Sequence, residues 1–502
     1  MACLVLAASC SSGGRSADPP ERRSTALRYA VTSGATVDPA TAVDPDSISL
    51  AELTATPLVV IDPATSEPRP GLASRWTADR TQTVFTFTLD RNARFSTGAP
   101  VTAPDVVASL DRVVVPATRS PVADLLAEVE GYAVARAAGT PLEGIRAIGS
   151  RRVEITLNRA DATFPTALGH PALGIVRPDA DAPGGFVGAG AYAVARSDAS
   201  GWILRRRRGG GAERIVVRRY PDATASRAAV TDGDADLALI SRDAGTTFGG
   251  GLRPVSAPYV AVSNYALDLS NPKFANPDFR RAILQALDGS ALVRSTFGPT
   301  VGVANGVIPE TVAGHGRKPC RGVCEYDPDG ARTALARAFP AGGVPAISID
   351  HDATPTQTRL AEVARQQLAA VGITANPRPH PVAEYDDFLA NGDPELFRLG
   401  WVASDPSAEA FLLPVFATGA PENVAHVSSL AADLTAIAAS RTADAAERNR
   451  LYRNAERSVL EQIAVKPVVQ YRTRYLARSR VRGLAVDLLG GIFADYPGLA
   501  ER

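Results

Sequence analysis

Residues 71–113 read GLASRWTADRTQTVFTFTLDRNARFSTGAPVTAPDVVASLDRV, and they contain one strand and one helix start that can be recognised directly. In VFTFTL (84–89) apolar side chains alternate with threonines, which predicts a strand with one buried face. Thr102 and Asp105 have the spacing of a capping box, in which two side chains satisfy the free amides of a helix's first turn. An apolar-periodic run follows them, so we expect a strand and then a helix.

The same kind of helix start recurs further along the chain. Asn276-Pro277, Asp327-Pro328 and Thr354-Pro355 each place a capping residue before a proline, which is favoured in the first helical turn. The last of these helices lies between the strand-like segments AISID and ITANP, within residues 346–378. A strand–helix–strand crossover implies parallel strands and an open α/β lobe. A long helix is expected at about 442–463, followed by the strand-like VVQYRTRYL.

Composition limits the classes of protein that this chain can belong to. It has 502 residues, with 53 Lys+Arg against 53 Asp+Glu. A formal net charge of zero argues against a dedicated nucleic-acid binder, which needs excess positive charge to displace phosphate counterions. The chain is 45% hydrophobic, so wholesale disorder is excluded. Its length is roughly three to four times the commonest domain size, so two or more lobes are expected.

One basic run stands out against this neutral background. Residues 205–211 read RRRRGGG, which suggests contact with nucleic acid or lipid headgroups. The run follows a strand-like WIL and ends in glycines that are typical of a turn. We therefore expect it to be the solvated end of a hairpin.

The N-terminal segment MACLVLAASC (1–10) resembles a bacterial lipobox. In that class of signal Cys10 receives a lipid and becomes the mature N-terminus. The basic residues that usually precede such a run are missing, as a misplaced start codon would explain; the alternative is a frayed apolar N-terminus. Residues 11–25 are rich in Gly, Ser and Pro and would form a flexible tether with a reach of at most about 50 Å.

No later stretch approaches the roughly 18–20 apolar residues of a transmembrane helix. The expected location is therefore extracytoplasmic, at the cell membrane through a lipid anchor. In such a compartment Cys320 and Cys324, in CRGVC, are expected to form a local disulfide. The nearest histidine, His315, does not complete a zinc tetrad. A loop this short gives about 2 kcal/mol of stabilisation.

Common catalytic templates are missing from the sequence. There is no HExxH, no GxSxG, no P-loop and no GxGxxG after a strand, and the five histidines are scattered. The acidic clusters are expected to be solvated faces. We therefore expect a protein that is not an enzyme and needs no metal or cofactor.

The order of segments resembles the family 5 extracellular solute-binding proteins, the peptide-binding lipoproteins of ABC importers. The most specific match is residues 71–113, and the resemblance runs from about residue 26 to 495. Other matching segments, in family order, are Gly188–Tyr192, 214–240, 279–293, 306–310, 326–335, 400–416 and 468–484.

The resemblance implies a two-lobed α/β periplasmic-binding-protein-like fold (type II, cluster C) with a discontinuous first lobe and two hinge strands. The expected divisions are a first lobe at 26–262 with an inserted subdomain at 56–186, a second lobe at 263–466 and a return to the first lobe at 467–502. The hinge strands are expected near Tyr259–Leu267 and Pro467–Tyr471. The lobes would close on a ligand that contacts both.

The resemblance also suggests ligand-binding residues in the second lobe. Trp401 is the expected wall of the cleft, with a packed core tryptophan as the alternative. The family's Gly-Trp motif carries an Asp four positions after the Gly, which pairs with a peptide's α-ammonium. Here Ser404 occupies that column and Asp405 follows it, so an extended segment would point Asp405 the other way. We hypothesise that a local backbone change still brings Asp405 to the cleft.

Three further candidates come from the same resemblance. Asn264 lies on the first hinge strand, where its amide could bond either the ligand or the hinge backbone. Ser33 and Gly34 lie in the loop after the first strand.

The sequence therefore predicts a monomeric receptor that captures a peptide-like or other amphiphilic solute and delivers it to an ABC permease. The alternative is a lipoprotein of the same fold that regulates or scaffolds cell-envelope assembly without transport. An envelope hydrolase is a third possibility, for which no nucleophile–base pair is visible.

Overall fold

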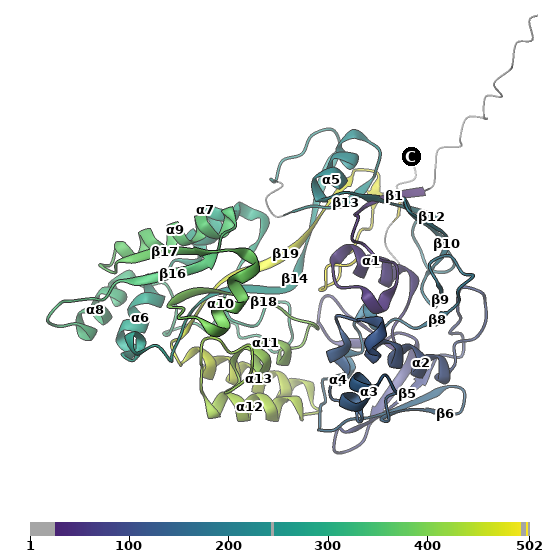
Figure 1. Cartoon of the computed structure of the whole chain (residues 1–502), viewed down its shortest axis with the longest axis horizontal. Coiled ribbons are helices and arrows are strands. Elements are labelled where there is room, and N and C mark those ends of the chain that lie inside the picture. Colours follow the sequence, from purple (N-terminus) through teal and green to yellow (C-terminus); the bar gives the residue numbers. More distant parts are fainter. Residues whose placement is uncertain (1–25, 242–244, 493–497, 500–502) are drawn as a thin grey trace, which may run out of the picture.

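Two long antiparallel strands connect the two lobes of the molecule (Figure 1). The computed structural model describes residues 26–241, 245–492 and 498–499. The connecting strands are β14 (Leu252–Leu267) and β19 (Val465–Arg478), and they pair with each other from Leu252↔Arg478 to Ala266↔Val465. They contain the segments expected to form the hinge. The α/β two-lobed fold is confirmed.

A single sheet runs through both lobes. Within the described residues it has eleven strands in the order β10-β11-β12-β1-β13-β19-β14-β18-β16-β17, with β15 beside β19. The strands on the first-lobe side are β1 (Ala26–Thr32), β10 (Tyr192–Asp198), β11 (Gly201–Arg206), β12 (Arg214–Tyr220) and β13 (Leu237–Leu239). Those on the other side are β15 (Gly302–Val303), β16 (Ile347–Asp352), β17 (Ala375–His380) and β18 (Leu396–Val402).

The expected helix caps and the crossover are confirmed. Asn276, Asp327 and Thr354 accept backbone hydrogen bonds at the starts of α6 (Pro277–Ala286), α8 (Pro328–Ala338) and α9 (Pro355–Ala369). The strands β16 and β17 on either side of α9 are parallel. The second lobe is completed by α7 (Gly289–Phe297), α10 (Tyr385–Asn391), α11 (Glu409–Phe416), α12 (Leu430–Ser440) and α13 (Ala445–Leu460).

A separate four-stranded sheet interrupts the first lobe. After α1 (Pro45–Thr54) the chain leaves the large sheet and returns to it at β10. The predicted strand is β5 (Val84–Leu89), with Phe85, Phe87 and Leu89 buried, and the capping box begins α2 (Ala103–Val114). The other strands of this sheet are β4 (Ala73–Ala78), β6 (Ile145–Ile148) and β7 (Arg152–Thr156).

Short elements connect these layers. They are β2 (Val59–Ile61), β3 (Pro68–Pro70), α3 (Tyr132–Ala138), α4 (Phe164–Ala167), β8 (Val176–Pro178), β9 (Phe186–Gly188), α5 (Ala223–Asp232), β20 (Val481–Arg482) and β21 (Gly498–Leu499). The antiparallel pair β11–β12 has the basic run at its connection, so the expected hairpin end is confirmed.

One buried carboxylate ties the beginning of the first lobe to the chain that returns to it. Asp236 accepts hydrogen bonds from the backbone N and Nη2 of Arg28, each at 2.9 Å, and from Nε of Arg480, also at 2.9 Å. Burial alone would raise the pKa of Asp236, but the hydrogen bonds from the two arginines hold it below its ordinary value. Strand β1, the segment before β13 and the chain after β19 are thereby joined at one point.

Replacing Asp236 with Ala is expected to lower the free energy of unfolding by about 3 kcal/mol, because it removes one partner from a buried ion pair. Urea denaturation measures this change. Asp232→Ala, at an exposed carboxylate nearby, is the control and should change stability by less than about 0.5 kcal/mol. Equal effects of the two substitutions would contradict the role of Asp236.

Candidate ligand-binding cleft

A cavity of about 870 Å³ lies where the two lobes meet the hinge strands. The first lobe contributes Pro45 and residues 239–241, and the hinge strands contribute Tyr259, Val262 and residues 471–474. The second lobe contributes the start of α9 and the end of β18. A molecule in this cavity would touch both lobes, which is the condition for a ligand to favour closure.

Two aromatic side chains, Phe297 and Trp401, line the cavity on the second-lobe side. Trp401, on β18, lines the cavity and also packs against the hydrophobic core, and its Nε1 donates to the carbonyl of Ala410 at 2.8 Å. Phe297 and Tyr471 meet edge to face with ring centroids 6.4 Å apart. Such rings provide large apolar contact area with few rotatable bonds.

A fixed cation lies beside this wall. Nε of Arg398 is 2.9 Å from Oδ2 of Asp352, and its guanidinium carbon is 5.3 Å from the ring centre of Tyr385. Asp352 also accepts from the hydroxyl of Thr354, the capping residue of α9, at 2.6 Å. Arg398 and Thr354 both line the cavity. A held guanidinium suits the recognition of a carboxylate.

Ser404 and Asp405 lie in the loop after β18, outside the wall of this cavity. Ser404 is exposed, and Oδ1 of Asp405 accepts from the backbone N of Ser407 at 2.8 Å. Burial raises the pKa of Asp405, and the hydrogen bonds from Ser407 lower it in part. The charge of Asp161, in the interrupting segment of the first lobe, also acts on Asp405.

The other three candidates also lie outside the wall. Asn264 is buried on β14, between Leu399 and Pro467 in the ladder, and its Oδ1 has no hydrogen-bond partner among the described residues. Ser33 and Gly34 are exposed after β1, where Ser33 donates to the carbonyl of Pro221 at 3.2 Å. Of the six candidates, the structure brings Trp401 alone to this cavity.

The sequence did not single out Tyr259, Tyr471 or Arg398. Tyr259 and Tyr471 bound the hinge segments that the sequence did locate, whereas Arg398 lies on β18, a strand that it did not predict. Tyr259 and Tyr471 could have been found from the sequence, because each is an aromatic residue at one end of a predicted hinge segment.

A second contact between the lobes centres on Glu409, at the start of α11. Its Oε2 accepts from the hydroxyls of Thr163 and Tyr452, each at 3.2 Å, and its Oε1 is 3.4 Å from Nη2 of Arg159. The backbone N of Ala162 donates to the carbonyl of Ser440 at 2.6 Å. The interrupting segment of the first lobe is thus bonded to α11 and α12 of the second.

The charges at this contact are not balanced. The negative charges of Asp161 and Asp405 both disfavour ionisation of Glu409. The cation beside Glu409, Arg159, is shared with Glu128, whose Oε2 lies 2.8 Å from Nε of Arg159. Burial, and then the charge of Asp161, raise the pKa of Glu409 to about 7. Burial also raises the pKa of Asp161.

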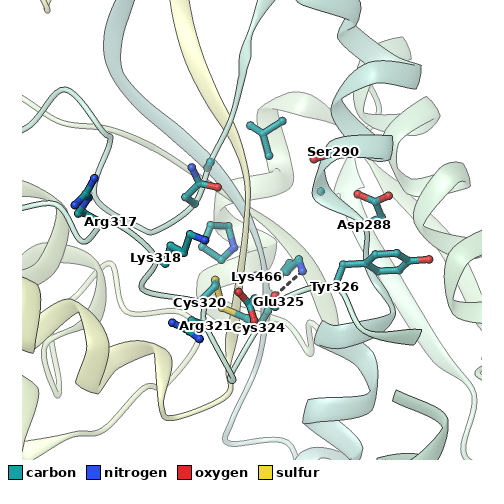
Figure 2. Close-up of a pocket in the computed structure, with 15 residues that line it drawn as sticks. Asp288, Ser290, Arg317, Lys318, Cys320, Arg321, Cys324, Glu325, Tyr326 and Lys466 are labelled. Carbon is teal, nitrogen blue, oxygen red and sulfur yellow. Dashed lines mark hydrogen bonds between the residues drawn. A yellow bond between two sulfur atoms is a disulfide. The ribbon is translucent and has the colours of Figure 1, made fainter. Parts of the chain in front are cut away.

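A smaller cavity of about 270 Å³ lies within the second lobe (Figure 2). Figure 2 shows Lys466 pointing to Cys324, whose carbonyl accepts from its Nζ at 2.5 Å. Burial lowers the pKa of Lys466 to about 8. Cys320 and Cys324 lie at disulfide distance, with S–S 2.06 Å. This cavity has no wall from the first lobe's strands, so a ligand here could not draw the lobes together.

Cys10 and the expected tether lie outside the described residues. Among the described helices, none combines the length and the apolar composition that crossing a bilayer requires. The described part of the chain also contains no cluster of His, Cys, Asp and Glu suited to a metal ion.

Comparison with known protein families assigns the chain to one of them. Residues 67–423 match the model of the bacterial extracellular solute-binding proteins, family 5, middle part. The chain belongs to this family.

Curated relatives of this solute-binding protein include glutathione-binding proteins called GsiB. The protein from Salmonella choleraesuis is 26% identical over 428 residues, which cover 79% of this chain and 80% of that protein. The protein from Escherichia coli strain K12 is 27% identical with the same coverage.

Solved structures of similar fold extend over nearly the whole chain. The periplasmic murein tripeptide binding protein MppA, in its unliganded open form, has a TM-score of 0.83 at 20% identity, covering 95% of this chain and 96% of that one. OppA of Haemophilus influenzae in complex with the peptide RPPGFSPFR has a TM-score of 0.64 at 19% identity, covering 95% and 99%.

The contact at Glu409 is expected to weaken as the pH rises. A carboxyl group whose pKa is raised from 4.5 to about 7 stabilises the contact below pH 4.5, and that contribution is lost as the pH rises through 7. Between pH 5 and 8 the wild-type protein should lose about 2 kcal/mol of stability that Glu409→Gln retains. Thermal denaturation across this pH range measures the difference.

Glu422→Gln, at an exposed glutamate of the same lobe, is the matched control and should follow the wild-type profile. A Glu409→Gln profile parallel to that of the wild type would show that Glu409 does not titrate in this range.

Proposed function

We propose that this protein captures a peptide-like or other amphiphilic solute between its lobes and delivers it to an ABC importer. The observation that carries this proposal is the cavity whose walls come from both lobes and both hinge strands. A lipid on Cys10 would hold the protein, as a monomer, on the outer side of the cell membrane.

Relatives support a peptide-like ligand. GsiB is named as a glutathione-binding protein, MppA as a murein tripeptide binding protein, and the OppA structure holds a peptide. The chain is more similar to the open, unliganded MppA than to the peptide-bound OppA. We infer that the described conformation is the open state, from which a ligand would select closure.

The proposed binding mode assigns a part of the ligand to each part of the cleft. Trp401, Tyr259 and Tyr471 would cover apolar side chains, and Arg398 would bind a carboxylate. Asp405 is the candidate for a terminal ammonium, which requires its loop to release the hydrogen bond from Ser407.

Asn264, Ser33 and Gly34 are kept as candidates that closure would bring to the ligand. The buried Oδ1 of Asn264 accepts no hydrogen bond from the described residues, so a ligand could donate to it. Ser33 and Gly34 are exposed and offer polar groups to a ligand. In an oxidising compartment, the disulfide between Cys320 and Cys324 would persist and constrain the loop between these two residues.

The direct test is a ligand screen. Mass spectrometry of whatever co-purifies with the protein, followed by calorimetry with a panel of tripeptides and glutathione, should identify a ligand. Small-angle scattering should then show a smaller radius of gyration when that ligand binds. A protein that binds nothing in the panel and keeps one shape would overturn the receptor and favour an envelope scaffold.

Trp401→Ala is expected to weaken ligand binding about thirtyfold, because removal of a central aromatic contact typically costs about 2 kcal/mol. Calorimetry with the ligand found in the screen measures the loss. Trp76→Ala, at the half-buried tryptophan of β4 that stacks on Phe87, is the control and should leave affinity unchanged. Unchanged affinity in Trp401→Ala would make that residue a packing tryptophan only.

Arg398→Met is expected to weaken binding of a peptide with a free C-terminus at least tenfold and to leave its C-terminal amide unaffected. A charge-assisted pair contributes about 1.5–3 kcal/mol. The C-terminal amide carries no charge, so it cannot form this pair with Arg398. For each protein, the affinity for the free-acid peptide is divided by the affinity for its C-terminal amide. A folding defect lowers both affinities equally, so a change in this ratio between wild type and variant reports on the pair alone. The same design with Asp405→Ala and an N-acetylated peptide tests the ammonium site; equal losses for both peptides would refute either assignment.

A further inference from the structure

Three arginines share one exposed face of the first-lobe sheet. In the ladder between β11 and β12, Arg205 stands directly opposite Arg214, and Arg218 lies further along the same face of β12. All three side chains are exposed. We call Arg205, Arg214 and Arg218 the basic face.

The positive charge of the basic face is uncompensated. Like charges placed directly opposite in a ladder are destabilising. In the part of the chain that the structure describes, none of the three arginines forms an ion pair with a carboxylate. Neighbouring strands do pair theirs: Arg196 of β10 is 2.8 Å from Asp198, and Arg28 of β1 is 2.9 Å from Asp236. The sheet therefore tolerates a repulsion that an anionic partner would relieve.

The hairpin end carries further arginines, of which Arg206 leaves β11 on the face opposite Arg205. Nη1 of Arg206 donates to the carbonyl of Gly211 at 3.0 Å, and Nη2 of Arg208 donates to that of Ala189 at 3.0 Å. These bonds go to neutral carbonyls, so they fix the guanidinium groups without neutralising them. Burial, and then the charge of Arg208, lower the pKa of Arg207, which is another sign of crowded cations.

The chain enters the fold at the same place. Ala26, the first described residue, pairs with Arg214 in the parallel ladder between β1 and β12. Figure 1 shows β1, β12 and β10 together at one end of the molecule, away from the second lobe. Residues 1–25, which include Cys10, therefore join the fold next to the basic face.

We propose that the basic face is a docking surface for anionic phospholipid headgroups. Each arginine close to an anionic bilayer contributes favourably, and a sheet face is flat enough to present several at once. Docking would hold the first lobe against the membrane and leave the second lobe free to close. The cellular setting rests on the proposed lipid anchor, but the affinity for lipid does not.

Nucleic acid fits this face less well. Single strands bind on aromatic side chains interleaved with basic ones. Trp202, on β11, is 3% exposed and lies under Arg219, with 4.0 Å between the guanidinium carbon and the ring centre. It belongs to the core that packs on α1 and is not available for stacking.

The test uses the full chain with Cys10→Ser, which cannot be lipidated, and vesicles of phosphatidylcholine with or without 30% phosphatidylglycerol. We expect at least about a hundredfold stronger binding to the anionic vesicles, lost in 0.5 M NaCl. The triple variant Arg205→Gln, Arg214→Gln, Arg218→Gln should bind them about a hundredfold more weakly, at about fivefold for each arginine. Co-sedimentation measures the partitioning.

The matched control removes the same charge elsewhere: Arg75→Gln, Arg91→Gln, Arg146→Gln, at exposed positions of the interrupting segment. Equal loss in both triple variants would overturn the proposal, as would equal binding to neutral vesicles. Stronger binding to single-stranded DNA than to anionic vesicles would reassign the face to nucleic acid. Peptide affinity measured on the same variants reports separately on the proposed receptor function, and the basic-face variant should keep it.

Discussion

The ladder between β14 and β19 is the constraint on which the rest of the structure depends. Each strand also belongs to the sheet of one lobe, because β19 pairs with β13 and β14 pairs with β18. The lobes can move relative to each other only as far as this two-stranded ribbon twists. The register between the strands shifts at Pro258/Val262 and at Ser263/Asn264, and such irregularities are where a ribbon bends most easily. Tyr259 and Val262, at the first of these shifts, line the cavity, so part of the surface that a solute would touch lies where the ribbon bends.

Much of the architecture could be predicted because it is encoded locally. Alternation in VFTFTL and the cap at Thr354 each depend on a few neighbouring residues, and both were found where they were expected. The ordered resemblance then supplied the topology. The cleft was harder to predict, because its wall combines residues distant in sequence, such as Tyr259 and Arg398. Trp401 was recognisable from its Gly-Trp context, whereas the partners that hold Arg398 lie on β16 and α10.

The position of Asp405 shows that sequence alone does not predict which groups surround a candidate binding residue. Its carboxylate accepts from the backbone of Ser407 and lies in the electrostatic environment of Asp161 and Glu409. Those two acids belong to different lobes, and their proximity follows from tertiary packing alone. A chain can thus keep the residue types of a binding motif and give them new neighbours. The basic run shows the complementary case, since the hairpin was predictable but the alignment of Arg205 with Arg214 required the register.

The tie made by Asp236 has a consequence for how such receptors diversify. Because Arg28 and Arg480 meet on that carboxylate, both ends of the described chain are anchored in one lobe. The other lobe is therefore a single uninterrupted cassette between β14 and β19. Recombination could exchange that cassette with only two junctions, each inside a paired strand. New ligand preferences could then arise without disturbing the half of the molecule in which Arg28 and Arg480 meet.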